Sequence, residues 1–516
     1  MRLSVCLALI GLCSLAQADP NFEFNLERGP YAVGVRVLEQ YDYARVYKRR
    51  FDTMTGKPVQ GERARPIQAL VWYPTRQGGT PVLYDYYVRT TRSEEDFTMS
   101  PQEIERQMAA WIVQRSARLS KVLLQKELAR PMWAVRDAIP APGKYPLVVY
   151  APSFSASANE SADMCEYLAS QGYVVIASPD MGTRTREMNE DLEGIETQAA
   201  DIHFLISSAH TLPQADMGHI AVVGFSWGGI SNVFAAARDD RIGALVSLDG
   251  SLRSFPKFVD GGADAAKYVT PDRVAVPLLY IASRPKSIEQ LGSEKSDLAY
   301  SFMNSMKYSD VYLATMQPMV HPDFSSYYLR VVPADPAAPY SRQEVLTAYG
   351  WTVRYVHQFL DAYLKQSAPA LAFLKTPDAA NGAPRHMMTL EMRPAKSTAP
   401  NFERLTLELN TNGFEHAVAV YKKMRQTDPK FSVSENSMNE WGYALYRAGR
   451  SKDAIEVFKL GVTAYPESGN LSDSLAEVYE SVGNKALAIE HYRRAHDLDE
   501  DNSNAVRHLK ALGAPQ

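Results

Sequence analysis

The sequence has little cysteine: three residues among 516, two of which lie within the first 18 positions. Cys165 is the one cysteine of the later chain. A single cysteine forms neither an intramolecular disulfide nor a cysteine-based metal cluster. The pattern around it predicts a helix between strands, where cysteine usually acts as a small buried apolar residue. A catalytic thiol at Cys165 is the less favoured alternative.

An excess of charge of one sign is also missing. The formal net charge is −4, from 55 basic and 59 acidic residues, which gives no general attraction to nucleic acid or to an anionic membrane. After the first 18 residues no apolar run is long enough to cross a bilayer. We therefore expect no nucleic-acid partner and no transmembrane segment. No motif indicates a cofactor or a bound metal.

The first 18 residues have the pattern of an export signal. Arg2 provides a positive start, residues 3–15 are an apolar run, and Ala16-Gln17-Ala18 offers the small residues that a signal peptidase cleaves after. We expect a signal peptide over residues 1–18 and a mature chain that begins near Asp19. The mature protein would then be periplasmic or secreted.

Short apolar strands alternate with helical patterns through the middle of the chain. Apolar runs of this kind, separated by helices, predict a mostly parallel sheet covered by helices on both faces. A helical insert, at about residues 101–130, interrupts the alternation, and its apolar face either covers a site or packs on the sheet. The clearest strands are residues 146–150, 173–177, 220–223, 244–248, 277–282 and 311–315, the last of these being the final strand.

Composition changes after a helix near residues 342–365. Residues 376–400 contain several proline, alanine and asparagine residues and are interpreted as a linker, so a first domain would span residues 19–375. Residues 401–516 repeat: Ala454 and Ala488 are 34 residues apart, the period of the tetratricopeptide repeat. We expect an all-helical module of this type there, with an ordinary helical hairpin as the alternative.

The sequence Gly224-Phe225-Ser226-Trp227-Gly228 follows a buried strand and opens a helix rich in small residues. This is the nucleophile-elbow pattern, in which glycines on both sides of a serine permit a very tight strand–turn–helix connection. The turn exposes the serine oxygen at the rim of the sheet. The pattern predicts the α/β-hydrolase fold, with Ser226 as nucleophile.

A serine nucleophile needs a base and an acid, which this fold supplies after the serine in sequence. His321 follows the predicted strand 311–315, whereas its rival His357 lies within an amphipathic helix. Asp249 follows the strand 244–248 and is the favoured acid, because the next strand is followed by no acid before Glu289.

The developing oxyanion needs two backbone donors. One is the amide after the nucleophile, which belongs to Trp227. The other comes from the loop after strand 146–150, where Pro152 has no amide hydrogen and Phe154 is the better donor, with Ser153 as the alternative.

Several segments resemble the platelet-activating-factor acetylhydrolases and the related dienelactone-hydrolase-like group. They are residues 29–34, 144–150 and 167–174, together with the elbow. The resemblance extends over roughly residues 29–365 and implies metal-independent ester hydrolysis, often of short acyl groups, by Ser226, Asp249 and His321. The chain departs from that family at Pro152-Ser153, where the family usually has His-Gly, and at Phe225, where it has His.

The sequence therefore predicts an exported serine hydrolase that cleaves carboxylic esters through a Ser-His-Asp triad and an acyl-enzyme. Its partners would be a small acyl ester and, through the repeat module, another protein. Two alternatives stay open. One is a peptidase or amidase with the same triad, and the other is a binding protein with an inactive hydrolase domain.

Overall fold

The computed structural model describes residues 21–76, 79–285 and 296–514. The predicted signal peptide, residues 1–18, lies outside them. The chain divides into two compact units, the first ending at Lys396 and the second beginning at Ser397. Each unit is described separately.

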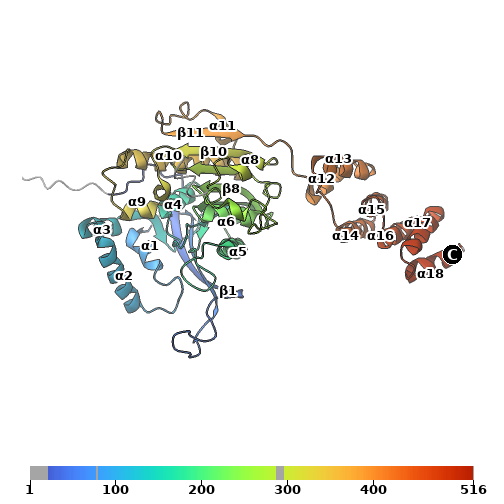
Figure 1. The fold of residues 1–516 in the computed structure, drawn as a ribbon, viewed down its shortest axis with the longest axis horizontal. Helices are drawn as coiled ribbons and strands as arrows, with labels where there is room; N and C mark the ends of the chain where they lie inside the picture. Colours follow the sequence, from blue (N-terminus) through green and yellow to red (C-terminus); the bar gives the residue numbers. More distant parts are fainter. Residues whose placement is uncertain (1–20, 77–78, 286–295, 515–516) are drawn as a thin grey trace, which may run out of the picture. The chain divides into compact units, whose positions relative to one another are not determined.

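Eleven strands in the described residues form one sheet in the first unit (Figure 1). The spatial order is β11-β10-β9-β8-β7-β5-β6-β2-β1-β4-β3. The run from β10 to β6 is parallel throughout, and antiparallel pairs occur toward both edges. The sheet is therefore mostly parallel, as predicted. The strands are β1 (Ala32–Val46), β2 (Ala64–Thr75), β3 (Pro81–Leu83), β4 (Pro131–Arg136), β5 (Tyr145–Ala151), β6 (Val174–Ala177), β7 (Ala215–Phe225), β8 (Ile242–Leu248), β9 (Leu278–Ala282), β10 (Val311–Met316) and β11 (Met388–Arg393).

Helices cover both faces of this sheet. Successive residues of a strand point to opposite faces, so the wholly apolar strand β5 contributes to two cores. Val148 and Tyr150 belong to one buried cluster, and Leu147 and Val149 to the other. The first cluster also contains side chains of α4 (Ala162–Ser170) and α10 (Arg342–Leu364), and the second those of α5 (Leu192–Ser208) and α6 (Gly228–Ala236).

The helical insert consists of α2 (Pro101–Ser116) and α3 (Lys121–Leu128), and α1 (Tyr84–Thr90) precedes it. The side chain of Ser100 accepts a hydrogen bond from the Glu103 amide and so caps α2. Met108 and Trp111 of α2 are buried in the first core cluster. The apolar face of the insert thus packs on the core of the first unit, and Trp111 also lines a cavity there.

Two predictions near the end of the first unit are wrong. The strand at residues 311–315 is not the last one, and residues 376–400 are not wholly a linker. β11 lies within that range and pairs antiparallel with β10, from Met316 opposite Met388 to Val311 opposite Arg393. Alternate residues of β11, Leu390 and Met392, pack against the first core cluster. The surrounding proline and alanine residues had obscured this short alternating segment.

Short helices complete the connections of the first unit. They are η1 (Ala209–Thr211), η2 (Pro256–Phe258), α8 (Ser301–Ser305), η3 (His321–Phe324), α9 (Ser326–Val331) and α11 (Ala368–Lys375).

The second unit is all-helical in its described residues. α14 and α16 begin at Glu435 and Gly469, 34 residues apart, and α15 and α17 begin with the same offset. Equivalent positions touch across this offset, since the Tyr443 hydroxyl donates to Glu477 at 2.6 Å. The helices are α12 (Phe402–Asn412), α13 (Ala417–Thr427), α14 (Glu435–Arg447), α15 (Ser451–Ala464), α16 (Gly469–Ser481), α17 (Lys485–Leu498) and α18 (Ser503–Ala511), with η4 (Phe414–His416).

Candidate active site

The turn between β7 and α6 holds Ser226 in a left-handed backbone conformation, with φ at 53°. Such a φ is rare for a residue with a side chain and costs free energy that the surrounding packing must offset. The flanking glycines are required sterically. A Cβ on Gly224 would lie 2.1 Å from the carbonyl oxygen of Gly228, and one on Gly228 would lie 2.1 Å from that of Ala151. The local geometry is that of the predicted nucleophile elbow.

His321 lies beside the serine. It is the first residue of η3, which follows β10, and its Nε2 is 2.8 Å from the Ser226 Oγ. The aromatic ring of Phe225 packs against the imidazole, with ring centroids 5.2 Å apart. The residue that replaces histidine before the serine therefore supports the imidazole on one side.

Asp249 completes the contact chain, because its Oδ2 is 2.7 Å from the His321 Nδ1. It follows β8 directly, and its Oδ1 accepts a hydrogen bond from the Ser283 amide. Burial alone would raise the pKa of Asp249, but the hydrogen bond and charge of His321, together with Ser283, hold this pKa below its usual value. An ionised carboxylate can only accept, so the network assigns a proton to Nδ1 and leaves Nε2 as acceptor for the serine hydroxyl.

The structure also brings the two predicted oxyanion donors to this end of the sheet. The rings of Phe154 and Trp227 are in edge-to-face contact, with centroids 5.5 Å apart. In the described part of the chain, neither backbone amide has a hydrogen-bond acceptor. Two amides without acceptors at this end of the sheet are what the predicted oxyanion hole requires.

The backbone amides on both sides of Phe154 already donate hydrogen bonds. The Ser153 amide donates to Glu160 Oε2 at 2.8 Å, and the Ser155 amide donates to Asp180 Oδ2 at 2.8 Å. The alternative donor, Ser153, is therefore committed elsewhere. Gln198 fixes the start of the same loop by donating to the carbonyl oxygen of Pro152. The Ala156 amide donates to the Ser153 carbonyl oxygen, so among residues 153–156 Phe154 is the one whose amide has no acceptor in the described part of the chain.

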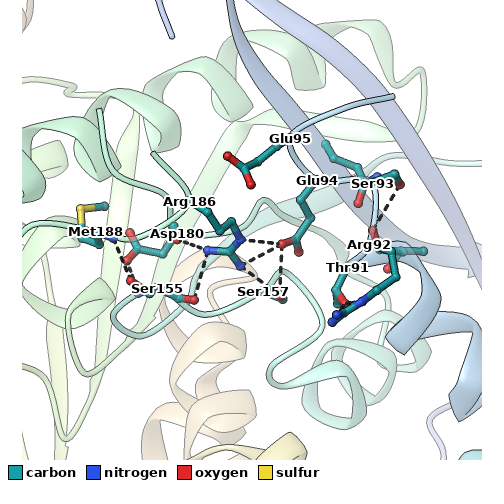
Figure 2. A network of polar contacts seen from close by, with 12 residues as sticks. Thr91, Arg92, Ser93, Glu94, Glu95, Ser155, Ser157, Asp180, Arg186 and Met188 are labelled. Carbon is teal, nitrogen blue, oxygen red and sulfur yellow. Dashed lines mark hydrogen bonds and ion pairs between the residues drawn. The ribbon is translucent and has the colours of Figure 1, made fainter. Parts of the chain in front are cut away.

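A buried polar network holds this oxyanion loop, residues 153–157, in place (Figure 2). Arg186 donates to the carbonyl oxygens of Ser155 and Asp180, and to the Oγ of Ser157. Its Nη2 also lies 2.8 Å from Glu94 Oε2, in an ion pair whose carboxylate is buried. Because burial raises the pKa of Glu94 and Arg186 opposes that rise, the two charges depend on each other.

Glu160 is a second buried acid behind the loop. It accepts hydrogen bonds from the Ser153 amide, the Ser153 hydroxyl and the Tyr150 hydroxyl. Burial raises its pKa in spite of these donors. Sequence reasoning missed Glu160, Arg186 and Glu94, since no local pattern marks any of them.

The rival residues lie elsewhere. His357 is on α10, where its Nδ1 is 3.1 Å from the Tyr167 hydroxyl and its Nε2 is 3.1 Å from Asp361. Cys165 is fully buried, and burial raises the pKa of its thiol well above the usual value, which disfavours a reactive thiolate. Glu289, the rival acid, lies outside the described residues.

Two kinds of feature are absent from the described ranges 21–76, 79–285 and 296–514. Within them no cluster of histidine, cysteine and acidic side chains could hold a metal ion. Within the same ranges no helix has the length and apolar character needed to cross a bilayer.

The chain is similar to known hydrolases in sequence and in fold. A "Putative carboxymethylenebutenolidase" of Yersinia pestis is 29% identical over 121 residues, which cover 21% of this chain and 45% of that relative, so the chain spans under half of that protein's length. A solved ferulic acid esterase from Streptomyces cinnamoneus is 19% identical, with a TM-score of 0.49 over 72% of this chain and 99% of that structure. The family of X-Pro dipeptidyl-peptidases (S15 family) matches residues 65–383, which is more than half of the chain and contains the elbow, Asp249 and His321. The chain therefore belongs to the X-Pro dipeptidyl-peptidase (S15) family of α/β-hydrolases.

Proposed function

We propose that this protein hydrolyses carboxylic esters through an acyl-enzyme formed on Ser226. The observation that carries the proposal is the continuous contact from Ser226 through His321 to Asp249. In the first half-reaction the Ser226 oxygen attacks the ester carbonyl carbon while His321 Nε2 takes the hydroxyl proton. The Phe154 and Trp227 amides stabilise the oxyanion, and His321 then donates the proton to the departing alcohol.

The second half-reaction repeats these roles with water. His321 takes a proton from the water that attacks the acyl carbon, and returns it to Ser226 as the acid leaves. Asp249 keeps the imidazole in the tautomer that accepts from the serine and stabilises its charged form. The resemblance to platelet-activating-factor acetylhydrolases and dienelactone-hydrolase-like proteins supports an ester with a short acyl group.

Substitution of the nucleophile tests this proposal. Ser226→Ala is expected to lower turnover of 4-nitrophenyl acetate by very roughly a million-fold, because a triad without its nucleophile retains only the oxyanion and binding contributions. The variant should keep the circular-dichroism spectrum of the parent. Undiminished turnover in the folded variant would show that Ser226 is not the nucleophile.

A peptidase is the second candidate, and the S15 family membership favours it. The same triad can cleave an amide, with the amine as the leaving group. Alanyl-proline 4-nitroanilide and an activated ester with the same acyl group separate the two functions. We expect turnover of the ester without detectable turnover of the anilide, and anilide turnover that is lost in Ser226→Ala would establish the peptidase.

The second unit is proposed to be a tetratricopeptide-repeat module that binds a protein partner. The 34-residue offset between helix pairs supports this proposal. Deleting residues 397–516 tests it. A partner role predicts that the remaining hydrolase stays soluble and active but loses the partner, whereas precipitation or inactivity would assign the module a structural role.

The alternative of a binding protein with an inactive hydrolase domain is excluded if the intact chain turns over esters.

Export to the periplasm or beyond the cell is proposed from the first 18 residues alone. The test is the amino-terminal sequence of the protein expressed with its full leader. Asp19 as the first residue supports export, and an intact Met1 in a functional protein contradicts it.

A further inference from the structure

A cavity lies next to the oxyanion loop, on the side of the helical insert. Its volume is about 400 Å³. One wall comes from the insert and the segment before it, with Val88, Arg92, Trp111 and Arg115. The other comes from the core, with residues 155–157, 159 and 160 and Tyr327.

Segments that adjoin both predicted catalytic loops border this cavity. Ser155 directly follows Phe154, whose amide is the proposed oxyanion donor. Tyr327 follows η3, the segment that begins at His321, and its amide donates to the carbonyl oxygen of Glu160 at 2.9 Å. A group held in the cavity would therefore lie beside the segments that carry Phe154 and His321, while the cavity walls include neither Ser226 nor His321.

Positive charge in the cavity is only partly neutralised. Arg186 is committed to Glu94 and to the oxyanion loop. Arg92 instead has only the Oγ1 of its neighbour Thr91 as a hydrogen-bond acceptor within the described residues, at 2.9 Å from its Nε, and Figure 2 shows its guanidinium apart from the Arg186–Glu94 pair.

The guanidinium of Arg115 has even fewer hydrogen-bond acceptors than that of Arg92. Its guanidinium lies over the ring of Tyr327, 5.6 Å from the centroid, and its buried Nε has no acceptor in the described ranges of the chain. Asn159, which also lines the cavity and is almost fully buried, has a Nδ2 donor without an acceptor there. Buried donors without acceptors are costly, and a ligand that brings acceptor oxygens would relieve that cost.

The acids around the cavity do not cancel this charge. Glu160 is used by the Ser153 amide, the Ser153 hydroxyl and Tyr150, and Glu187 is exposed to solvent, where its field is screened. Burial lowers the pKa of Arg92, with Glu94 opposing this effect and the cations of Arg186 and Arg115 adding to it. Glu94, the acid that acts on Arg92, would repel a dianion, so a single negative charge fits best.

We propose that this cavity binds a carboxylate of the substrate through Arg92 and Arg115, so that the preferred esters carry one carboxylate remote from the scissile bond. The proposal deepens the proposed ester hydrolase and rests on it for the catalytic part. Trp111, Val88 and the Tyr327 ring supply apolar walls for the chain between the two groups. Guanidinium groups match carboxylates in geometry as well as in charge.

The kinetic test uses two matched ester pairs. In one pair the carboxylate is on the acyl side, 4-nitrophenyl hydrogen adipate against its methyl ester, and in the other it is on the leaving group, 4-acetoxybenzoate against its methyl ester. We expect kcat/KM to favour the anion by about tenfold or more in at least one pair.

Variants of the two arginines test their part in this preference. Arg92→Gln and Arg115→Gln should each reduce the preference for the anionic ester by about tenfold, which corresponds to one charge-assisted contact. Arg118→Gln, an exposed arginine of the same insert that does not line the cavity, should leave the preference unchanged.

A binding measurement separates this proposal from the ester-hydrolase proposal. Calorimetry on the folded Ser226→Ala variant should detect monomethyl adipate, should fail to detect dimethyl adipate, and should lose the signal in the added Arg92→Gln/Arg115→Gln background. Equal binding of both compounds, or anion preference that survives the double substitution, overturns the carboxylate site. If the anion binds as expected and no ester is turned over, the carboxylate site stands and the ester-hydrolase proposal fails.

Discussion

Arg186 donates a hydrogen bond to the carbonyl oxygen of Ser155, 3.1 Å away, and so connects a distant loop to the residue that follows the proposed oxyanion donor. Every polar group of Ser155 is engaged: its amide by Asp180, its carbonyl by Arg186 and its hydroxyl by the Met188 amide. These bonds hold Ser155 at a φ of 55°, a left-handed conformation that it would otherwise adopt rarely. The direction of the Phe154 amide depends on this arrangement.

Substitution of Arg186 should therefore impair catalysis more than substrate binding. Arg186→Gln removes the bonds to the loop, and we expect kcat to fall by about 10- to 100-fold with KM changed less than threefold, the size of a misplaced oxyanion donor. Steady-state kinetics on 4-nitrophenyl acetate give both constants. Glu94→Gln keeps an acceptor and removes the charge, and should give a smaller loss in kcat.

Arg184→Gln is the matched control, since Arg184 is an exposed residue of the same segment. It should retain the kinetics of the parent. A loss in Arg186→Gln that appears only in KM, or that follows the thermal stability of the variants, would contradict a positioning role.

The position of the acid gives a second prediction. Asp249→Asn should lower kcat by about 10⁴-fold, because an amide in place of the carboxylate stabilises the wrong imidazole tautomer. Glu289→Gln should have no comparable effect. The measurement is kcat/KM for one activated ester in both variants at the same pH, and the opposite ranking would move the acid to the segment after β9.

A buried acid outside the proposed triad makes the free energy of unfolding depend on pH. Burial raises the pKa of Glu166 to about 7, although the Tyr87 hydroxyl and the Trp133 amide donate to its carboxylate. The unfolded chain has an ordinary glutamate, so between about pH 4.5 and pH 7 the native state binds more protons than the unfolded state. The free energy of unfolding therefore falls as the pH rises through this window, by up to about 3 kcal/mol from this group.

Glu166→Gln removes that titration while keeping the side-chain shape. The stability of the parent relative to this variant should decrease from pH 5 to pH 8, as measured by thermal unfolding in a series of buffers. Parallel curves for the two proteins would show that Glu166 ionises normally in the native state.

Packing in the second unit gives a fourth prediction. Gly442 of α14 faces Phe458 of α15, and a Cβ at Gly442 would lie 2.4 Å from the buried ring. Gly442→Val should destabilise the helical module by about 1–3 kcal/mol through overpacking. Thermal unfolding followed by circular dichroism measures this, and Glu440→Val, which adds the same side chain on the exposed side of α14, is the control. Equal destabilisation by both variants would contradict the packing explanation.

The sequence could reveal the elbow because its requirements are local. Glycines two residues before and after Ser226 are forced by backbone approach within one tight turn. Asp249 and His321 could be anticipated because each follows a parallel strand, and parallel strands end at the same edge of a sheet. Phe154 followed from the single missing amide of Pro152.

The supporting network could not be predicted in this way. Glu94 and Arg186 are 92 positions apart, and no local pattern connects them. The carboxylate cavity likewise depends on how the insert packs against the core, which places Arg115 over Tyr327. β11 was hidden for a different reason: its six residues contribute few apolar side chains, and proline-rich segments flank it.

The most direct test of the central claim is labelling of the full mature chain with a fluorophosphonate probe, followed by peptide mapping of the adduct. The probe reacts with a serine only where a base activates it, so one adduct is expected, on Ser226, with labelling abolished in Ser226→Ala and slowed strongly in His321→Gln. An adduct on another residue, or undiminished labelling in Ser226→Ala, would contradict the account.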